Sequence, residues 1–428
     1  MKIKNVVNNN NNVFNSFCTE SEANILKNFV HINTLKENNK KKIFYSYCIA
    51  DGYKYKIIIK KKKDYLNNLK LLILSLDHPH IIKLIHFCEL DSSFMCVFEF
   101  FTDINLYTSI SFSAKYDERK IKKIIYQIIL IVNYLHSNNL AHKKLSPHSF
   151  LIKTLNNEVM IKLDDVFKIK TVSAKSLNSK RKSLNVYSVG VIMYFLVCGE
   201  FPFSYFENDE KKILWKKISY KGLNFIKKIL LSDFSSMITI KEALDHVTQK
   251  KNNFFHLEWF KEDIKQNIYI NFDILKNIYD FWKKNTFKRY ILNSIAKFII
   301  KEDIYNYNYI FFYFDIIKEG SIKYEQYFII MKKLGLLDAN IKASFNGLDI
   351  SKVGLIQFSN IIASLLNSFI KIDKKIILKI FKKIDYNNEG IITKRKLYKL
   401  YNIKTKNEIS FNDKKKYTFE EFYNYICK

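Results

Sequence analysis

The feature that most constrains the fold is a short pattern, D-x-x-x-x-G-x-I, that occurs three times in the C-terminal part of the chain. The copies begin at Asp315, Asp349 and Asp385, and a fourth, altered copy covers residues 410–421. Each copy separates stretches with the apolar spacing of helices. Because such an internal repeat indicates one structural unit used several times, we predict helix–loop–helix units from about residue 270 onward.

The N-terminal half has a different pattern. Residues 43–60 and 94–101 alternate or run apolar with aromatics, which is typical of strands. Residues 64–76 and 117–136 have helical spacing instead. Strands therefore come first and helices follow, which predicts an α+β lobe and then a helical one. Residues 1–25 contain a run of asparagines and are predicted to be disordered.

Composition limits the classes of partner and compartment. The chain has 71 Lys and Arg against 41 Asp and Glu, a net charge of +30. This favours anionic partners, including peripheral contact with an anionic membrane surface. No recognised nucleic-acid motif is present, so we expect no specific nucleic-acid binding. The 6 cysteines lack paired spacing and no apolar run reaches membrane-spanning length, which predicts a cytoplasmic protein with reduced thiols.

Four further segments resemble, in order, the motifs of a known family. They are "LKLLILSLDHPHIIKLIHFCELDSSFMCVFEF", "YLHSNNLAHKKLSPHSFLI", "VMIKLDDVF" and "YSVGVIMYFLVCGEFPF". In this order they resemble calcium-dependent protein kinases, and the repeats follow where that family carries its calmodulin-like domain. The resemblance covers roughly residues 30–428. It implies an α+β bilobal protein-kinase fold followed by an all-α EF-hand-like domain.

The resemblance implies four parts. We expect a disordered N-terminus at 1–25, a degenerate kinase domain at 26–250 with its N-lobe ending near residue 101, a junction at 251–304 and a degenerate EF-hand-like domain at 305–428. The junction includes a basic amphipathic helix at 278–304. Because such helices suit the groove of an EF-hand pair, we expect this helix to contact the EF-hand-like domain.

The resemblance also shows that residues needed for phosphoryl transfer are replaced. Lys144 stands where the family has its catalytic aspartate, and a lysine at neutral pH is a cation with no acceptor. Ser146 and Ser149 stand at the supporting lysine and metal-binding asparagine. The glycine-rich loop aligns with residues 35–44, which contain no glycine. Side chains there obstruct the close approach of backbone N–H groups to phosphates.

Some nucleotide-binding positions remain. The β3 lysine of the family aligns with Lys60 or Lys56, and the spacing leaves both open. Asp165 aligns with the metal-binding aspartate and could hold Mg²⁺ if nucleotide binds. Leu69 replaces the αC glutamate that pairs with the β3 lysine, and Asn185 replaces an aspartate of helix αF. These replacements weigh against ATP and Mg²⁺ as cofactors without excluding them.

The repeated loops depart from calcium-binding loops in a similar way. Such loops need oxygen ligands at positions 1, 3, 5 and 12, with glycine at position 6. Loop 385–396 is the best preserved, but Lys396 stands at position 12. We expect calcium-free helix pairs joined at position 8 and leave weak calcium binding by this loop open. The position-8 residues are Ile322, Ile356, Ile392 and Tyr417. The retained candidate ligands are Asp385, Asn387, Glu389 and Thr393 and, more weakly, Asp315, Glu319, Asp349, Ser351 and Glu421.

The leading interpretation is a catalytically degenerate relative of these kinases that acts as an intracellular scaffold or regulator through an unidentified protein partner. Two alternatives stay open. The first is a residual Ser/Thr kinase in which Asp164 or Asp165 also takes the role of the missing catalytic aspartate. The second is a calcium-responsive binding module. Loss of phosphate incorporation on mutating Asp165 would support the first, and a calcium response lost on Asp385→Ala would support the second.

Overall fold

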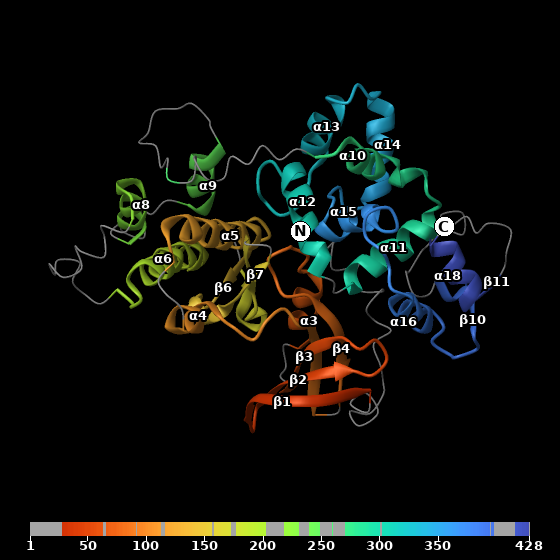
Figure 1. The fold of residues 1–428 in the computed structure, drawn as a ribbon, viewed down its shortest axis with the longest axis horizontal. Coiled ribbons are helices and arrows are strands. Elements are labelled where there is room, and N and C mark those ends of the chain that lie inside the picture. The colour runs from red at the N-terminus through yellow and green to blue at the C-terminus, as the bar shows by residue number, and fades with distance from the viewer. Residues whose placement is uncertain are drawn as a thin grey trace.

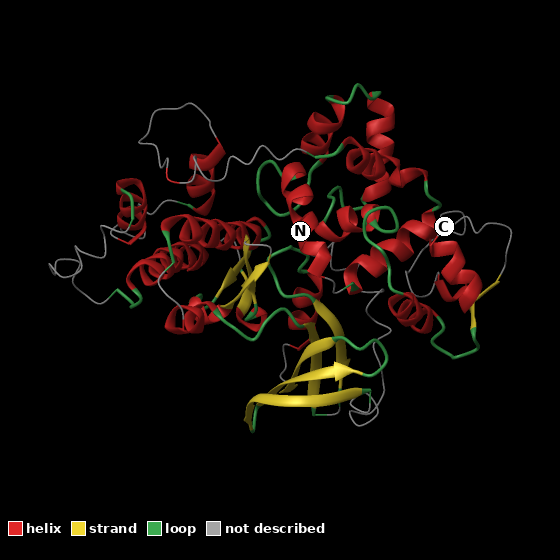
Figure 2. Cartoon of the chain, viewed as in Figure 1, coloured by secondary structure: helices red, strands yellow, loops and turns green. Residues whose placement is uncertain are grey.

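The structure is a computed structural model of the chain. It describes residues 28–62, 66–90, 92–112, 116–155, 158–172, 177–202, 218–230, 239–248, 259, 270–299, 302–393, 395–397 and 416–427. The segment 1–25, predicted to be disordered, lies outside these residues. A strongly twisted sheet lies on one side of the molecule, and two groups of helices, α4–α9 and α10–α18, lie beside it (Figures 1 and 2).

The N-terminal part is a 5-stranded antiparallel sheet in the order β1-β2-β3-β5-β4, accompanied by one helix. Successive side chains of a strand point to opposite faces, and both faces are covered here. Ile57 and Val97 belong to a core shared with the C-terminal helices, whereas Ile58 and Phe98 belong to the core of the middle helices. The sheet therefore joins the two helical groups. The elements are β1 (Phe29–Asn38), β2 (Lys41–Cys48), β3 (Lys54–Lys61), α3 (Leu66–Ser75), β4 (Leu84–Glu89) and β5 (Ser93–Glu99).

The middle part is built around the long helix α5 (Glu118–Ser137), as its apolar spacing predicts. Asp117 caps its first turn by accepting a hydrogen bond from the backbone N–H of Lys120. Two short ladders, β6–β9 and β7–β8, carry the catalytic-loop and metal-motif segments beside it. The other elements are α4 (Leu106–Phe112), β6 (Leu140–His142), η1 (Pro147–Ser149), β7 (Phe150–Leu155), β8 (Glu158–Leu163), η2 (Val166–Lys168), β9 (Ile169–Thr171), α6 (Leu177–Cys198), α8 (Tyr220–Leu230) and α9 (Ile240–Thr248).

The C-terminal part is almost entirely helical and contains the repeated loops. Ile322 and Ile356 exchange backbone hydrogen bonds, and Ile392 pairs with Tyr417. This confirms the predicted pairing at position 8. The elements are α10 (Phe272–Asp280), η4 (Phe281–Lys283), α11 (Thr286–Phe298), η5 (Glu302–Tyr307), α12 (Asn308–Phe314), α13 (Tyr324–Lys332), α14 (Asp338–Leu348), α15 (Phe358–Leu365), α16 (Lys374–Ile384), β10 (Ile391–Thr393), β11 (Lys416–Thr418) and α18 (Phe419–Cys427).

The single amphipathic helix expected over 278–304 is wrong in its extent. The chain turns after α10 and becomes extended at Lys284. Asn285 then caps a new helix, α11, by accepting a hydrogen bond from the backbone N–H of Phe287. Within the C-terminal core, α11 packs against α15 and α16, and Arg289 donates to the carbonyl oxygen of Gly347 at 2.8 Å.

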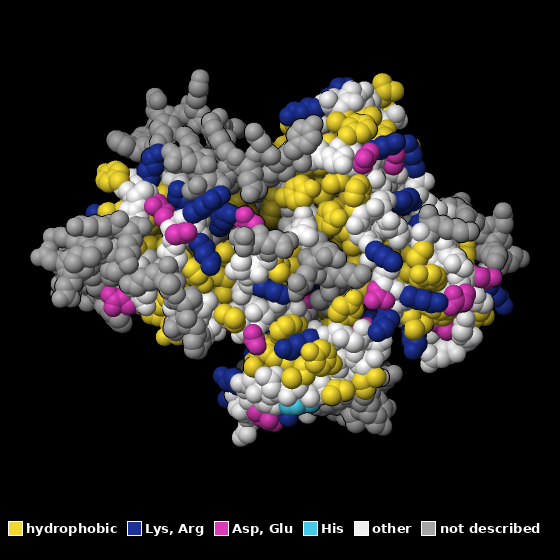
Figure 3. All heavy atoms as spheres, in the orientation of Figure 1, with side chains coloured by type: hydrophobic (Ala, Val, Ile, Leu, Met, Phe, Trp, Pro, Cys, Tyr) yellow, Lys and Arg dark blue, Asp and Glu magenta, His cyan; other side chains and the backbone are white. Residues whose placement is uncertain are grey.

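The predicted fold class is confirmed: a five-stranded lobe, a mainly helical second lobe and a helical C-terminal region follow one another along the chain. In the part of the chain that the structure describes, none of the helices has the length and apolar character needed to span a bilayer. On the face seen in Figure 3, Lys and Arg side chains are spread over several elements rather than gathered in one patch.

Candidate functional site

The segment that resembles a catalytic loop is held through its backbone. His142, at the end of β6, forms two hydrogen bonds with the side chain of Asn185 on α6. The backbone N–H of His142 donates to Asn185 Oδ1 at 2.9 Å, and Asn185 Nδ2 donates to the carbonyl oxygen of His142 at 2.6 Å. The His142 ring lies 3.0 Å, Nε2 to oxygen, from the carbonyl group of Asp165. Burial lowers the pKa of His142, so its ring is held neutral between these segments. The contacts fix β6 relative to the segment that follows β8.

Lys56 is the lysine of β3 that reaches this segment. Its ammonium group forms an ion pair with Asp164, and the two side chains are only 10% and 18% exposed. Asp164 is itself positioned by its backbone N–H, which donates to the carbonyl oxygen of Ser149 at 2.9 Å. Lys60, the other candidate, lies 4.8 Å above the ring of Phe167. The structure therefore brings Lys56 to the acidic segment and places Lys60 on an aromatic face.

Asp165, the candidate magnesium ligand, has a neighbouring lysine as its partner. Its Oδ2 atom lies 2.6 Å from Lys168 Nζ within the same turn, η2. Phe167 stands where the family has a glycine, and its ring lies 5.9 Å from that of Phe98 on β5. We call the region around Tyr45, Lys56, Asp164, Asp165 and Phe167 the interlobe region. Its acidic groups are paired internally in this arrangement.

Two aromatic rings, those of Tyr45 and Phe100, pack against each other where the interlobe region meets the segment after β5. Tyr45 of β2 is buried and meets Phe100 edge to face, with 5.1 Å between ring centroids. Burial raises the pKa of Tyr45, and the carboxylates of Asp164 and Asp103 raise it further. Tyr45 therefore lies between the acidic segment and the chain that follows β5. This pair could not be predicted from the sequence, because the local pattern does not fix the register of β2.

The turn between β1 and β2 aligns with the glycine-rich loop, and its amides already have an acceptor. The backbone N–H groups of Lys40 and Lys41 donate to the side-chain oxygen of Asn38 at 3.1 and 2.9 Å. This is a side-chain-closed turn of the kind that asparagine favours. In a phosphate-binding loop such amides would face the ligand.

The three residues at the catalytic positions occupy one short stretch. Lys144 is exposed, Ser146 is half-buried and Ser149 is buried. The hydroxyl oxygens of Ser146 and Ser149 lie 3.5 Å apart, at the limit of a hydrogen bond. None of the three provides a carboxylate, so this stretch offers neither a proton acceptor of the usual kind nor an anionic metal ligand.

These contacts do not fit Mg²⁺–ATP as protein kinases hold it. Those enzymes use a glycine-rich loop, a β3 lysine held by a glutamate of helix αC and a metal-bound aspartate. Here a metal-bound nucleotide would have to break the Lys56–Asp164 and Asp165–Lys168 pairs.

The first two repeated loops use their leading aspartate to close the loop. Asp315 accepts hydrogen bonds from the backbone N–H groups of Glu319 and Gly320. Burial raises its pKa to about 6, although nearby Lys318 and the Gly320 N–H act in the opposite direction. Asp349 accepts from Ser351 and from the Gly354 backbone in the same way, and burial raises its pKa also. In both loops, oxygens that could bind metal instead accept internal donors.

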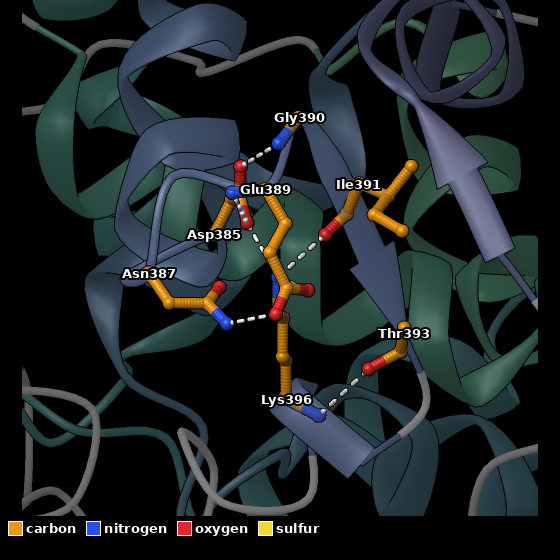
Figure 4. Close-up of polar contacts among 7 residues, drawn as sticks. All are labelled: Asp385, Asn387, Glu389, Gly390, Ile391, Thr393 and Lys396. Carbon is orange, nitrogen blue, oxygen red and sulfur yellow. Dashed lines mark hydrogen bonds and ion pairs between the residues drawn. The ribbon is translucent and has the colours of Figure 1, made fainter.

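In the third loop, two of the candidate ligands, Asp385 and Glu389, contact the side chain of a lysine (Figure 4). Lys396 Nζ lies 2.5 Å from Asp385 Oδ1 and 2.9 Å from Glu389 Oε2. Asn387 donates to Glu389, and the Thr393 hydroxyl accepts from the Lys396 backbone. Burial alone would raise the pKa of Asp385 and lower that of Lys396, but their mutual hydrogen bonds reverse both shifts.

The fourth loop lies partly outside the described residues. Glu421 is described: its carboxylate accepts a hydrogen bond from the backbone N–H of Thr418 at 3.1 Å. It therefore caps the start of α18. Among the residues that the structure describes, no group of three or more His, Cys, Asp or Glu side chains is placed to hold a metal ion.

A contact that the sequence did not reveal joins the first repeated loop to the middle helices. Asn133 of α5 donates to the carbonyl oxygen of Lys318 at 2.6 Å. Phe312 stacks on His80, with ring centroids 5.4 Å apart. The Ser359 hydroxyl donates to Asp77 at 2.5 Å. The C-terminal helices are therefore docked on the segment between α3 and β4 as well as on α5.

Comparison with known proteins agrees with the motifs. A model of the protein kinase domain matches residues 34–180. Calcium-dependent protein kinase 6 of Plasmodium berghei (strain Anka) is 27% identical over 388 residues, covering 82% of this chain and 25% of that protein. Calcium-dependent protein kinase 3 of the same organism is 26% identical over 395 residues, covering 84% and 69%. Calcium-dependent protein kinase 5 of Plasmodium falciparum (isolate 3D7) is 27% identical over 382 residues, covering 81% and 65%.

The chain spans 25% of the length of the first of these relatives and 65% to 69% of the other two. The similarity runs across both the kinase-like part and the repeated loops, since it covers at least 81% of this chain. Identity of 26% to 27% agrees with the many replaced motif residues. Over most of its length the chain is therefore similar to calcium-dependent protein kinases, with low identity.

Proposed function

We propose that this protein is a pseudokinase, which acts in the cytoplasm through contacts with a protein partner rather than through phosphate transfer. The observation that carries the proposal is the state of the interlobe region. Lys56 is paired with Asp164, Asp165 is paired with Lys168, and Lys144 stands at the position of the general base. Phosphoryl transfer depends on positioned metal ions and on a group that accepts the substrate proton.

The packing between the parts supports a scaffold role. Residues of the sheet, such as Ile57 and Val97, share one hydrophobic core with α10–α18. Polar contacts at Asn133 and Asp77 add to this interface. Because the parts share a core, they keep fixed positions relative to one another. A partner can therefore bind to their combined surface. The net charge of +30 favours a partner with an acidic surface.

The test is a phosphate-incorporation assay with labelled ATP, Mg²⁺, the full chain and a set of protein substrates, with Asp165→Asn as the matched control. We expect incorporation by the wild-type chain to equal that of the control. Incorporation that exceeds the control would overturn the proposal and restore the residual-kinase alternative.

A binding measurement separates a closed interlobe region from one that still accepts nucleotide. Thermal unfolding is followed with millimolar ATP and Mg²⁺ together and with each alone. Ligand at a hundred times its Kd stabilises a protein by about 2.7 kcal/mol. We expect no Mg²⁺-dependent rise in melting temperature, because binding must break two ion pairs. A rise that disappears in Lys56→Met would contradict that expectation.

A further inference from the structure

The ammonium group of Lys396 has three oxygen partners, and all three belong to the same 12-residue loop, 385–396. They are Asp385 Oδ1 at 2.5 Å, Glu389 Oε2 at 2.9 Å and the carbonyl oxygen of Ile391 at 2.8 Å. An ammonium group has three donors and no acceptor. Its hydrogen-bonding capacity is therefore matched by these contacts, as Figure 4 shows.

The three oxygens occupy positions 1, 5 and 7 of the loop. In calcium-binding loops of this kind, positions 1 and 5 supply side-chain oxygens and position 7 supplies its backbone carbonyl. The lysine itself is at position 12, where calcium loops carry the bidentate glutamate. Its side chain thus extends from the position of the strongest calcium ligand into the place where the other ligands converge.

We propose that Lys396 is a tethered cation that replaces calcium in this loop, so that the loop holds its closed form without metal. The ammonium group neutralises Asp385, whose side chain is 5% exposed, and is itself 6% exposed. Calcium and the ammonium group compete for the same oxygens, and only the ammonium group is covalently attached. This inference does not depend on whether the interlobe region transfers phosphate.

The rest of the loop supports a closed form. Asp385 also accepts hydrogen bonds from the backbone N–H groups of Glu389 and Gly390, at 3.2 and 2.7 Å. Ile392, in the centre of the loop's short strand, is buried and pairs with Tyr417. The backbone of the loop is thus fixed by the hydrogen bonds to Asp385 and by the pairing of Ile392 with Tyr417, and the lysine stabilises the same closed form. In the first two loops position 12 is Gln326 and Asn360, which bring no cation.

The proposal is tested by replacing the lysine with the glutamate of a calcium loop and with an apolar residue of similar length. Melting temperatures of full-length wild type, Lys396→Glu and Lys396→Met are measured in EGTA and in 1 mM calcium. A matched control, Gln326→Glu, places a glutamate at position 12 of the first loop. There the leading aspartate, Asp315, is buried and accepts hydrogen bonds from the backbone of its own loop.

We expect wild type to show no calcium-dependent shift at this loop. Lys396→Glu should melt below wild type in EGTA and regain stability in calcium, with a Kd of about 10⁻⁵ M, in the range of sensor loops. Lys396→Met should melt below wild type in both buffers, and Gln326→Glu should not respond to calcium.

Two results would overturn the proposal. One is a calcium-dependent rise in the melting temperature of wild type that Asp385→Ala abolishes, since calcium would then displace the lysine. The other is a melting temperature of Lys396→Met equal to that of wild type, since the ammonium group would then contribute nothing. The second result keeps the proposal testable even if Lys396→Glu does not fold.

Discussion

Gly320 is the position at which one added methyl group should separate the C-terminal helices from the kinase-like part. It is the sixth residue of the first repeated loop and has φ +74°. A Cβ built there would lie 2.4 Å from the ring of Tyr134 on α5 and 3.0 Å from the ring of His78. Both rings are buried in the interface that Asn133 joins to the same loop. Gly320→Ala should therefore weaken docking as well as the loop.

The second repeated loop provides the matched control. Gly354 holds the same sixth position with φ +76°, and a Cβ there would meet nothing within 4 Å. The backbone strain of an alanine at this φ, roughly 1 kcal/mol, is common to both substitutions. Overpacking of a filled interface adds about 1–3 kcal/mol. Gly320→Ala should thus lower the free energy of unfolding by about 2–4 kcal/mol, against about 1 kcal/mol for Gly354→Ala.

Urea unfolding of the two full-length variants and wild type measures these differences, and limited proteolysis reports whether the parts have separated. We expect Gly320→Ala to lose more stability and to be cut faster between the kinase-like part and the C-terminal helices. Equal losses in the two variants would refute the reasoning, because they would show that Tyr134 and His78 do not confine the loop.

Two more results follow from buried charges. Burial raises the pKa of Asp315 to about 6. Between pH 4 and 6 the folded chain therefore binds more protons than the unfolded chain. The free energy of unfolding that the protonated carboxyl group provides is lost as the pH rises through that window. Urea unfolding should show that stability of Asp315→Asn relative to wild type increases by up to about 3 kcal/mol from pH 4 to 7, and a flat difference would contradict the assignment. Lys56→Met should cost about 3 kcal/mol by stranding Asp164, whereas adding Asp164→Leu should recover much of that loss, and a double-mutant cycle without coupling would exclude the pair.

The parts of the fold that local pattern governs could be predicted from the sequence. The apolar spacing around Ile124 and Ile128 places α5, and the repeated aspartates place the loops. The pairing of Ile392 with Tyr417 follows from their positions in two neighbouring loops. The break before α11 could also have been found, because Asn285 followed by a helical pattern is a helix-start signal.

The parts that depend on side-chain reach or on distant segments could not be predicted. By the motif, Lys396 is a missing ligand, because the motif specifies which residue stands at position 12 and not where its side chain reaches. Lys56 and Lys60 lie on the same face of β3, so the choice between them depended on which part of the strand meets the acidic segment. The docking of Gly320 on Tyr134 joins residues that no local pattern connects.

Lys56 and Lys396 share one physical role. Each forms an ion pair with an aspartate in a segment that resembles a ligand site. For Lys56 this segment is the one that resembles a metal-binding motif, and for Lys396 it is a loop that resembles a calcium loop. Loss of a ligand from a site that keeps its aspartate leaves a partly buried charge without a partner, which is strongly destabilising. A lysine from the same chain removes that penalty permanently and independently of ligand concentration. Stability of the wild type should therefore be insensitive to both ATP and calcium, and a dependence on calcium should appear only when Lys396 is replaced by glutamate.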